Sequence, residues 1–528
     1  MLAPLLVLAL AIAPNVPAVA AVDVEAPVSL TASDGSGLAI ARYDVDTVIV
    51  GPLAYTELRL AFDNPQDRVI EGRFNIALPD GAAVSRFAMQ IDGQWQEAEV
   101  VEKQAARRAY EDALHRRQDP ALLEQASPNA FSARVFPIAA KGRKELIVSW
   151  SEELAGRPWR LPLLGLPQLA AFKARVRHDG RVVVDERHER WVPTKDLAPT
   201  LPPIANALLR SDDVVVARVT IPGTSSSSAT SSSSPSTAVP TLILLDTSAS
   251  RGLGEGKDRR FVKDLAARLD PSGKQRFVVV GFDQTSAVLY DGKATAVSLA
   301  ERRALGASNL GAALDDAARL AKAHGLVRVV IVGDGLVTAG VEGDALVAKA
   351  KALGAVGVRR LDAIAVGGLR DVAALRQLVG AGLAEEGIVV DASDDADLAA
   401  VSAKRLGLPA KSNVAVAIEG ASQVWPRRLD GVQPGDQVVV VAELARGKPV
   451  KLTVGGAAVS LTTVVDDSTT GALRETAAPL LRRAWARAKI ERLLAARTAE
   501  NNPAAKAEIA EQIVKVSVEH RVLSPLTA

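Results

Sequence analysis

The chain contains no cysteine among its 528 residues. This absence excludes disulfide bonds, thiolate zinc sites, thiol nucleophiles and thiol redox couples. The five histidines are scattered, and none lies three to five residues from another, so a zinc-binding helix of the His-x-x-x-His type is excluded as well. Any metal site in this protein must therefore use oxygen ligands.

Neither a large excess of one charge nor a long apolar run is present. Lys and Arg total 63 against 61 Asp and Glu, a net charge of +2 that gives no reason to expect a nucleic-acid partner. No segment approaches about 20 uninterrupted apolar residues, so no transmembrane segment is expected in this chain. Hydrophobic residues make up 48%, which is enough to build cores. At about 150 residues per domain, the length predicts two to four domains.

The N-terminus has the pattern of a leader peptide. An apolar run at residues 2–12 is followed by a small-residue stretch in which Ala18 and Ala20 satisfy the A-x-A cleavage pattern. The first basic residue is Arg42, so the basic start typical of such leaders is missing, and a frayed apolar N-terminus is the alternative. We expect residues 1–20 to be a signal peptide and the protein to be exported, to the periplasm, the cell surface or the medium.

Alternation of apolar and polar residues dominates the first part of the chain. Residues 57–62 and 70–78 alternate on either side of a turn, which predicts a hairpin with one buried face. Residues 102–117 lack Gly and Pro and predict one helix. We therefore expect a β-sandwich-like domain carrying one helix over residues 27–155.

Other segments are distinguished by composition and pattern. Residues 156–223 are expected to be a β-rich connecting segment, and residues 224–240, which carry no charge and are rich in serine, a linker. A further β segment is expected at residues 411–465, and helices over residues 476–520. The first of these helices carries several arginines, but its apolar residues do not form one clean face, so it is predicted to pack between domains rather than on a membrane.

From residue 241 the pattern changes to short apolar strands that alternate with helical segments. The expected strands are residues 241–245, 276–281, 327–332, 361–366 and 387–390. Alternation of this kind predicts βα crossovers and a doubly wound, mainly parallel sheet over residues 241–406. The fold class is therefore multidomain, α/β plus β. Ligands of doubly wound sheets bind outside the carboxyl ends of the strands.

Three loops at that edge carry oxygen-bearing side chains. The first strand runs into a D-x-S-x-S sequence made by Asp246, Ser248 and Ser250. Such a sequence is weak by itself, because Asp and Ser after a strand also cap helices and turns. Ser308 leads into a later helix and Asp334 follows the strand 327–332, so both are expected at the same edge. Two carboxylates and three hydroxyls suit a hard cation, Mg²⁺ first, with Mn²⁺ or Ca²⁺ as alternatives.

Residues 241 to about 400 resemble the von Willebrand factor type A domain. Its metal-ion-dependent adhesion site is matched residue by residue by Asp246, Ser248, Ser250, Ser308 and Asp334. The resemblance implies direct coordination by the three serines, with the two aspartates acting largely through water. Ser308 stands where the family usually has Thr, which keeps the hydroxyl, and the position before Asp334 is Gly rather than a common Thr.

Short motifs carry a second resemblance, at residues 64–65, 78–81, 106–111, 121–125 and 128–131 in the first domain and at residues 485–494 and 518–525 in the tail. On these motifs the first domain is similar to the vault protein/inter-alpha-trypsin (VIT) domain, and the tail resembles the same group of proteins. The domain order is that of inter-alpha-trypsin inhibitor heavy chains and their bacterial relatives, which continue past the last residue here and so leave a further C-terminal segment open. The Asp-Pro-His context of their glycan linkage is absent, so that linkage is not expected.

Together these features predict an exported, non-enzymatic binding or adhesion protein. Its α/β domain would hold a divalent cation and, through it, an acidic group of a protein or glycan partner. One alternative is a Mg²⁺-dependent phosphohydrolase of the haloacid dehalogenase type, which also places an aspartate after its first strand but needs a second acid where Ser248 stands. Another alternative is a structural envelope scaffold in which the metal only stabilises the domain.

Overall fold

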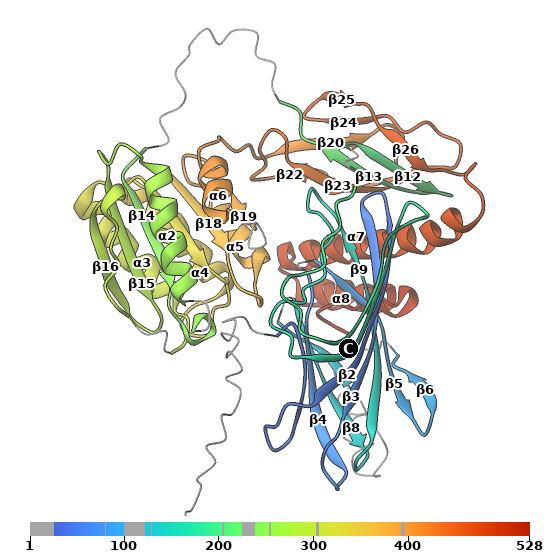
Figure 1. Cartoon of the computed structure of the whole chain (residues 1–528). Helices are drawn as coiled ribbons and strands as arrows, with labels where there is room; N and C mark the ends of the chain where they lie inside the picture. Colours follow the sequence, from blue (N-terminus) through green and yellow to red (C-terminus); the bar gives the residue numbers. More distant parts are fainter. Residues whose placement is uncertain are drawn as a thin grey trace, which may run out of the picture.

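The computed structural model describes residues 26–79, 81–99, 122–127, 129–202, 205–223, 238–252, 255–302, 306–391 and 397–527. They form a β-sandwich domain (residues 26–202), an α/β domain (residues 238–406), a β-rich domain (residues 205–223 and 411–465) and a helical hairpin (residues 472–520) (Figure 1). The expected leader at residues 1–20, the expected helix at 102–117 and nearly all of the serine-rich linker lie outside the described residues.

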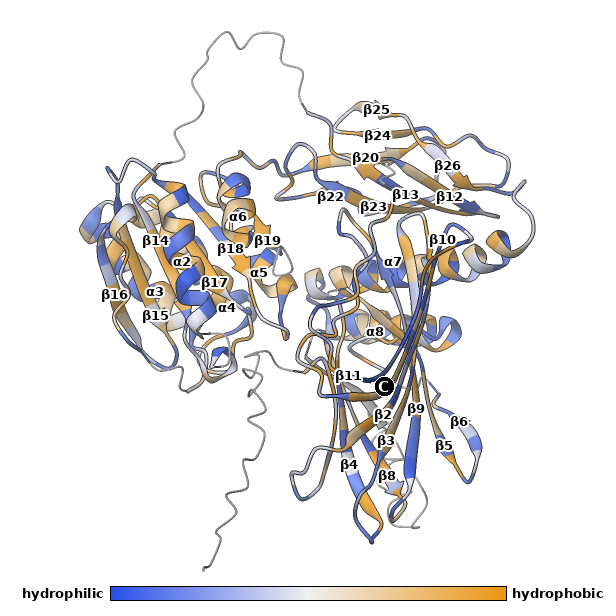
Figure 2. Ribbon diagram, in the orientation of Figure 1, coloured by the Kyte–Doolittle hydropathy of each residue, from blue (hydrophilic) through white to orange (hydrophobic). Residues whose placement is uncertain are grey.

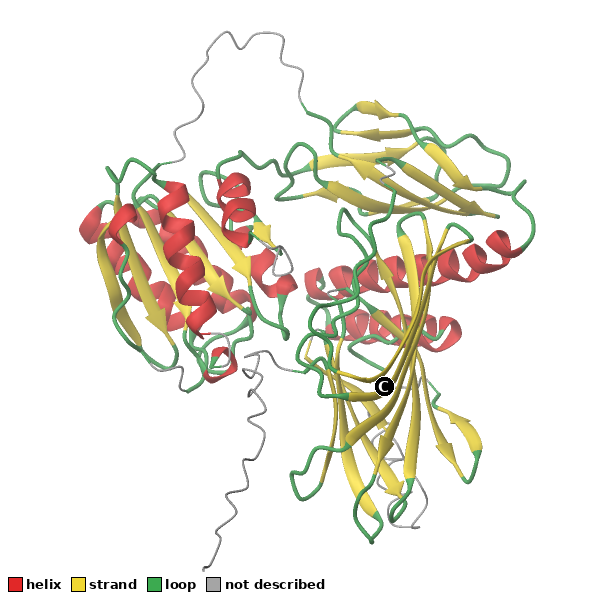
Figure 3. Ribbon diagram, viewed as in Figure 1, coloured by secondary structure: helices red, strands yellow, loops and turns green. Residues whose placement is uncertain are grey.

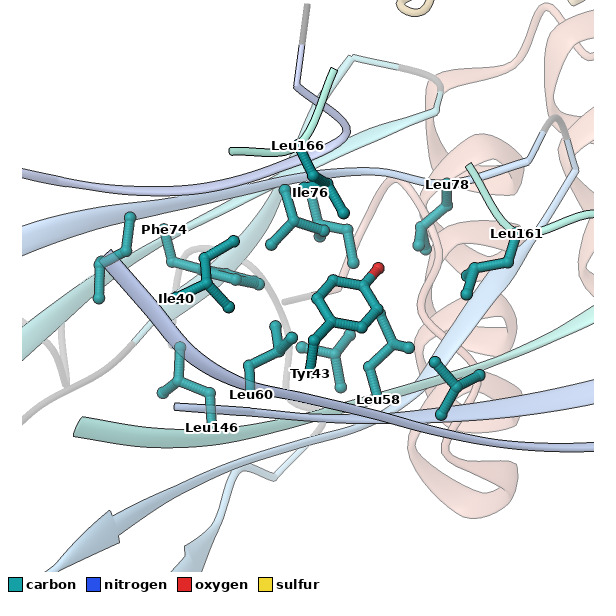
Figure 4. Packing of buried hydrophobic residues seen from close by; sticks show 14 of the residues in the cluster. Ile40, Tyr43, Leu58, Leu60, Phe74, Ile76, Leu78, Leu146, Leu161 and Leu166 are labelled. Carbon is teal, nitrogen blue, oxygen red and sulfur yellow. The ribbon is translucent and has the colours of Figure 1, made fainter. Parts of the chain in front are cut away.

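Two sheets packed face to face form the β-sandwich domain. The four-stranded sheet has the order β1 (Val28–Ala32), β4 (Ile70–Ala77), β8 (Ala130–Ile138), β7 (Leu122–Ser127). The seven-stranded sheet has the order β11 (Arg181–Trp191), β10 (Leu169–His178), β2 (Ala39–Val50), β3 (Leu53–Asp63), β9 (Arg143–Glu153), β5 (Ala83–Ile91), β6 (Gln94–Glu97). Inward-facing side chains of both sheets, among them Tyr43, Leu60, Phe74 and Ile76, share one core (Figure 4). The predicted sandwich is therefore observed.

The segment expected to connect domains at residues 156–223 is divided between two of them. β10 pairs in parallel with β2, so it extends the seven-stranded sheet. β12 (Ala207–Ser211) and β13 (Val214–Thr220) instead join the β-rich domain, where β13 pairs with β23 (Gln437–Glu443). Local alternation identifies a strand but not its partner, because the partner can lie hundreds of residues away.

In the α/β domain a six-stranded sheet is covered by helices on both faces (Figure 3). The sheet order is β16 (Ser286–Lys293), β15 (Arg276–Phe282), β14 (Thr241–Asp246), β17 (Arg328–Gly333), β18 (Arg360–Ala365), β19 (Val389–Val390). On one face lie α3 (Leu310–His324), α4 (Gly343–Ala352) and α5 (Val372–Val379); on the other lie α2 (Glu255–Leu269) and α6 (Leu398–Leu406). The central strands are mostly apolar, as expected of strands that helices cover on both sides (Figure 2). The predicted doubly wound, mainly parallel fold is observed.

Chain connectivity makes the α/β domain an insertion into the β-rich domain. One sheet of the β-rich domain has the order β21 (Gln423–Trp425), β23, β13, β12, β26 (Thr462–Val465), and the other β22 (Arg428–Leu429), β20 (Val414–Ile418), β24 (Leu452–Val454), β25 (Ala457–Val459). β12 and β13 precede the α/β domain in the chain, and all the other strands follow it. A single core of side chains from both parts closes the β-rich domain.

The helical hairpin packs between the β-sandwich domain and the β-rich domain. α7 (Ala472–Ala499) contacts β3 and β9 of the first and β12, β13 and β23 of the second, and α8 (Pro503–His520) packs along α7. Leu480, Leu481 and Ala484 of α7 share a core with Leu53 and Val216. The predicted role of this helix in domain packing is thereby observed. Within the described residues, no helix combines the length and apolarity needed to cross a membrane.

A buried ion cluster lies at the amino edge of the α/β sheet. Asp362 is fully buried between Arg360, whose Nε donates to its Oδ1 at 2.9 Å, and Arg328, whose Nε lies 3.5 Å from its Oδ2. Arg328 also donates to the carbonyl of Leu406, the last residue of α6, and Arg360 to that of Leu408 just after it. The cluster therefore ties the end of α6 to the first residues of β17 and β18.

This cluster allows a direct test of its contribution to stability. The change Asp362→Ala should lower the free energy of unfolding by about 3–5 kcal/mol, because it leaves two buried arginines without their carboxylate. Asp316→Ala breaks an exposed ion pair with Arg319 and should change stability little. Urea unfolding of the two variants measures both effects. Equal and small losses in the two variants would contradict the role given to Asp362.

Candidate metal centre

The loops that carry the candidate ligands follow neighbouring parallel strands. β14 pairs with β17 along its length, so Asp246 at the end of β14 and Asp334 just after β17 reach the same edge of the sheet. Ser308 reaches that edge from another loop. It directly precedes Asn309, whose side chain accepts a hydrogen bond from the Ala312 amide and so caps α3. The structure brings together all of the predicted residues.

Hydrogen bonds connect the side chains of these residues into one chain. Ser308 Oγ donates to Asp246 Oδ2 over 3.4 Å, and the Ser248 amide donates to Asp246 Oδ1 at 2.8 Å. The hydroxyls of Ser248 and Ser250 are 3.1 Å apart, and Ser250 Oγ donates to Asp334 Oδ2 at 2.7 Å. The predicted oxygen donors therefore face one another across a small volume.

Four of the five residues are buried, and one is at the surface. Asp246, Ser248, Ser308 and Asp334 are between 1% and 4% exposed, whereas Ser250 is exposed. A ligand can therefore reach the group of oxygens from the side of Ser250.

Two carboxylates buried together create an unbalanced charge. Burial and the neighbouring Asp334 raise the pKa of Asp246 to about 6, and burial also raises the pKa of Asp334. The nearby Arg251 is committed to another carboxylate, because its guanidinium donates twice to Asp258. A divalent cation among these oxygens would balance the two negative charges.

The chemistry of the donor set fits a hard cation and no other. No cluster of three or more His, Cys, Asp or Glu side chains that could hold a metal lies among the described residues. A cation at this edge therefore depends on the hydroxyls of Ser248, Ser250 and Ser308 as well as on the carboxylates. Oxygen-only sets of this kind suit Mg²⁺, Mn²⁺ or Ca²⁺ rather than zinc or copper.

Sequence reasoning missed Thr338, which fixes the position of Ser308. The Ser308 amide donates to Thr338 Oγ1 at 2.8 Å, and the amides of Thr338 and Ala339 both donate to the Ser308 carbonyl oxygen at 3.1 Å. These bonds join the Ser308 loop to the loop after Asp334. A threonine four residues past a predicted ligand carries no recognisable signal, because the contact depends on the path of the loop.

Both neighbours of Asp334 in the chain are glycines, because surrounding atoms leave no room for a side chain at either position. A Cβ at Gly333 would lie 2.8 Å from the Cβ of Asp246, so Asp246 occupies the room that a side chain would need. Gly335 has a positive φ of 78°, and a Cβ there would lie 2.7 Å from the Asp371 carbonyl oxygen. The departure from the common Thr at position 333 therefore has a physical reason in this chain.

Comparison with known proteins identifies the first domain. The family model of the vault protein inter-alpha-trypsin domain matches residues 40–149. None of the curated proteins compared with the chain matches it.

Several solved structures are similar to parts of the chain. A von Willebrand factor type A protein from Catenulispora acidiphila is 19% identical, with 60% of this chain and 84% of that one covered and a TM-score of 0.28. The ArnB paralog VWA2 from Sulfolobus acidocaldarius is 12% identical, with 60% and 89% covered and a TM-score of 0.26. The pilus adhesin SpaC from Lactobacillus rhamnosus GG, in its open conformation, is 13% identical, with 49% and 46% covered and a TM-score of 0.26. The chain thus contains a vault protein inter-alpha-trypsin domain at residues 40–149, beside a doubly wound α/β domain at residues 238–406.

Proposed function

We propose that this protein is a non-enzymatic binding protein whose α/β domain holds a divalent cation and uses it to bind an acidic group of a partner. The observation that carries the proposal is the convergence of two buried carboxylates and three hydroxyls at one sheet edge. Asp246, Ser248, Ser250, Ser308 and Asp334 would hold the cation, with Mg²⁺ the first candidate and Mn²⁺ or Ca²⁺ the alternatives. The domain combination supports a binding role rather than catalysis.

The composition of the site explains why an acidic partner is expected. Serine hydroxyls are neutral ligands, so a cation held partly by them keeps more of its positive charge than one held by carboxylates alone. Ser250 is exposed, which leaves one side of the site accessible. A carboxylate supplied by a protein or an acidic glycan is the group that such a cation would attract. The protein's net charge of +2 offers no broad basic surface as a substitute.

Export belongs to the same proposal. The apolar run at residues 2–12 and the small residues Ala18 and Ala20 support passage to the periplasm, the cell surface or the medium. A chain without cysteine folds without disulfide formation in such a compartment.

Cation binding is tested by calorimetry with Mg²⁺. We expect wild type to bind and Asp246→Ala to lose binding, because the variant lacks one of the two carboxylates that balance the cation. Asp291→Ala removes a carboxylate that pairs with Arg276 at the opposite edge of the sheet and should bind like wild type. Equal binding by wild type and Asp246→Ala would exclude the assignment of the site.

The close approach at Gly333 provides a second test. In Gly333→Ala the new methyl group should displace Asp246, and overpacking of this kind costs about 1–3 kcal/mol. We expect affinity for Mg²⁺ to fall at least about fivefold, since 1.4 kcal/mol corresponds to tenfold. Gly256→Ala, where a Cβ has no neighbour closer than 3.9 Å, is the matched control and should leave the affinity unchanged. Unchanged affinity in both variants would show that Asp246 is not a ligand.

Partner chemistry is tested with carboxylate polymers. We expect the protein to be retained on immobilised poly-glutamate or on pectate in Mg²⁺ and released by EDTA, because the cation provides the contact. Poly-glutamine is the uncharged control. Retention that persists in EDTA would contradict the proposal, and Mg²⁺ binding without any retention would favour the scaffold alternative. Mg²⁺-dependent hydrolysis of p-nitrophenyl phosphate, lost in Asp246→Asn, would favour the phosphohydrolase alternative.

A further inference from the structure

Asn129 of the β-sandwich domain makes a two-sided contact with the α/β domain. It lies just before β8 and is 2% exposed. Its Nδ2 donates to the Gly368 carbonyl oxygen at 2.7 Å, and its Oδ1 accepts from the Arg370 amide at 2.9 Å. Nδ2 also lies 3.3 Å from the Leu78 carbonyl oxygen of its own domain. One planar amide therefore holds two backbone groups of the loop between β18 and α5.

This loop, residues 366–371, is bonded directly to the candidate metal centre. Its first amide, that of Val366, donates to the Gly333 carbonyl oxygen at 3.0 Å, and its last, that of Asp371, donates to the Asp334 carbonyl oxygen at 2.7 Å. Arg251 Nη1 donates to the Val366 carbonyl oxygen at 3.4 Å. The loop therefore binds the backbone carbonyl groups on both sides of the Asp334 Cα, those of Gly333 and of Asp334 itself.

We propose that Asn129 is a positioning residue for the candidate metal centre. It fixes the loop at residues 366–371, and that loop in turn fixes the backbone of Asp334. The inference rests on the proposed cation binding and adds that the β-sandwich domain helps to set the affinity for the cation. Asn129 itself touches neither the cation nor the partner's carboxylate.

The geometry of the amide explains why this contact constrains the loop. An amide side chain presents a donor and an acceptor in one plane, so it can pair with a carbonyl and an N–H two residues apart. Losing it would leave the Gly368 carbonyl and the buried Arg370 N–H without this partner, which favours rearrangement of the loop. A site whose ligands are already in place binds more tightly than one that must first be ordered.

Further contacts of the same loop link it to the β-sandwich domain. Arg370 pairs with Asp391 at 3.4 Å, and Asp391 also pairs with Arg157 of the β-sandwich domain at 3.3 Å. Ser250 of the candidate site lines a cavity of about 1800 Å³, whose lining also includes Pro79 and Ala130 of the β-sandwich domain. The metal centre therefore opens toward the domain that carries Asn129.

A second buried amide offers a matched control. Gln433 of the β-rich domain is 1% exposed, and its Nε2 donates to the carbonyl oxygens of Arg405 and Leu408, at 2.8 and 3.0 Å. These groups lie in the last turn of α6 and just after it, at the amino edge of the sheet, where Arg360 donates to the same Leu408 carbonyl oxygen. Gln433 thus also makes an interdomain contact through a buried amide, with its NH₂ group alone, at the edge away from the candidate metal centre.

The test measures Mg²⁺ affinity by calorimetry in wild type, Asn129→Ala, Asn129→Asp and Gln433→Ala, together with amide hydrogen exchange of residues 366–371 without metal. We expect Asn129→Ala to bind Mg²⁺ at least about fivefold more weakly, the lower end of typical coupling between sites, and to exchange faster in this loop. Asn129→Asp keeps the acceptor for the Arg370 amide but has no donor for Gly368, and should lie between wild type and Asn129→Ala. Gln433→Ala should keep both wild-type values.

Each outcome decides between the two proposals. Wild type that binds no Mg²⁺ overturns the proposed function and this inference with it. If wild type binds Mg²⁺ and both Asn129 variants bind it as tightly as wild type does, this inference alone is overturned. An equal loss of affinity in Gln433→Ala also overturns it, because a general loss of domain contacts would then explain the effect. Thermal unfolding identifies any variant that fails to fold. If Asn129→Ala does not fold, Asn129→Asp tests the inference in its place.

Discussion

The burial of Asp246 and Asp334 at one edge of a parallel sheet is the constraint on which the rest of the site depends. Two like charges close together in a poorly solvated place are unfavourable, and burial raises the pKa of both groups. The surrounding structure supplies hydroxyls on Ser248, Ser250 and Ser308, while the neighbouring Arg251 is paired with Asp258. This arrangement is consistent with a site completed by a cation.

The two edges of the α/β sheet face different domains, and one of these is the β-rich domain into which the α/β domain is inserted. Because both ends of the α/β domain join the β-rich domain, its amino edge lies beside that domain, while its carboxyl edge faces the β-sandwich domain. A buried amide, Gln433 at one edge and Asn129 at the other, connects each edge to its neighbour. The candidate metal centre therefore lies beside an interface between domains rather than on an isolated part of the surface.

Much of the secondary structure could be predicted, and the exceptions have physical reasons. The buried strands β14, β15, β17 and β18 were predictable because helices cover both their faces and most of their residues are apolar. The antiparallel edge strand β16 was missed because most of its residues are partly or fully exposed. The short helix α6 was missed because it buries few side chains. The division of residues 156–223 between two domains was unpredictable, since its strands pair across long stretches of sequence.

The sequence by itself determined the chemistry of the candidate site: without cysteine and with scattered histidines, only oxygen ligands were available, and the D-x-S-x-S spacing placed three of them in one loop. It also predicted Asp334 at the same edge as Asp246, because the carboxyl ends of parallel strands coincide, and Ser308 at the start of a helix that begins there. Only the tertiary structure decided that Thr338 holds Ser308, that Gly333 makes room for Asp246, and that Asn129 reaches the loop beside Asp334. These contacts join residues far apart in the chain, and no local pattern records which distant groups a fold brings within hydrogen-bonding distance.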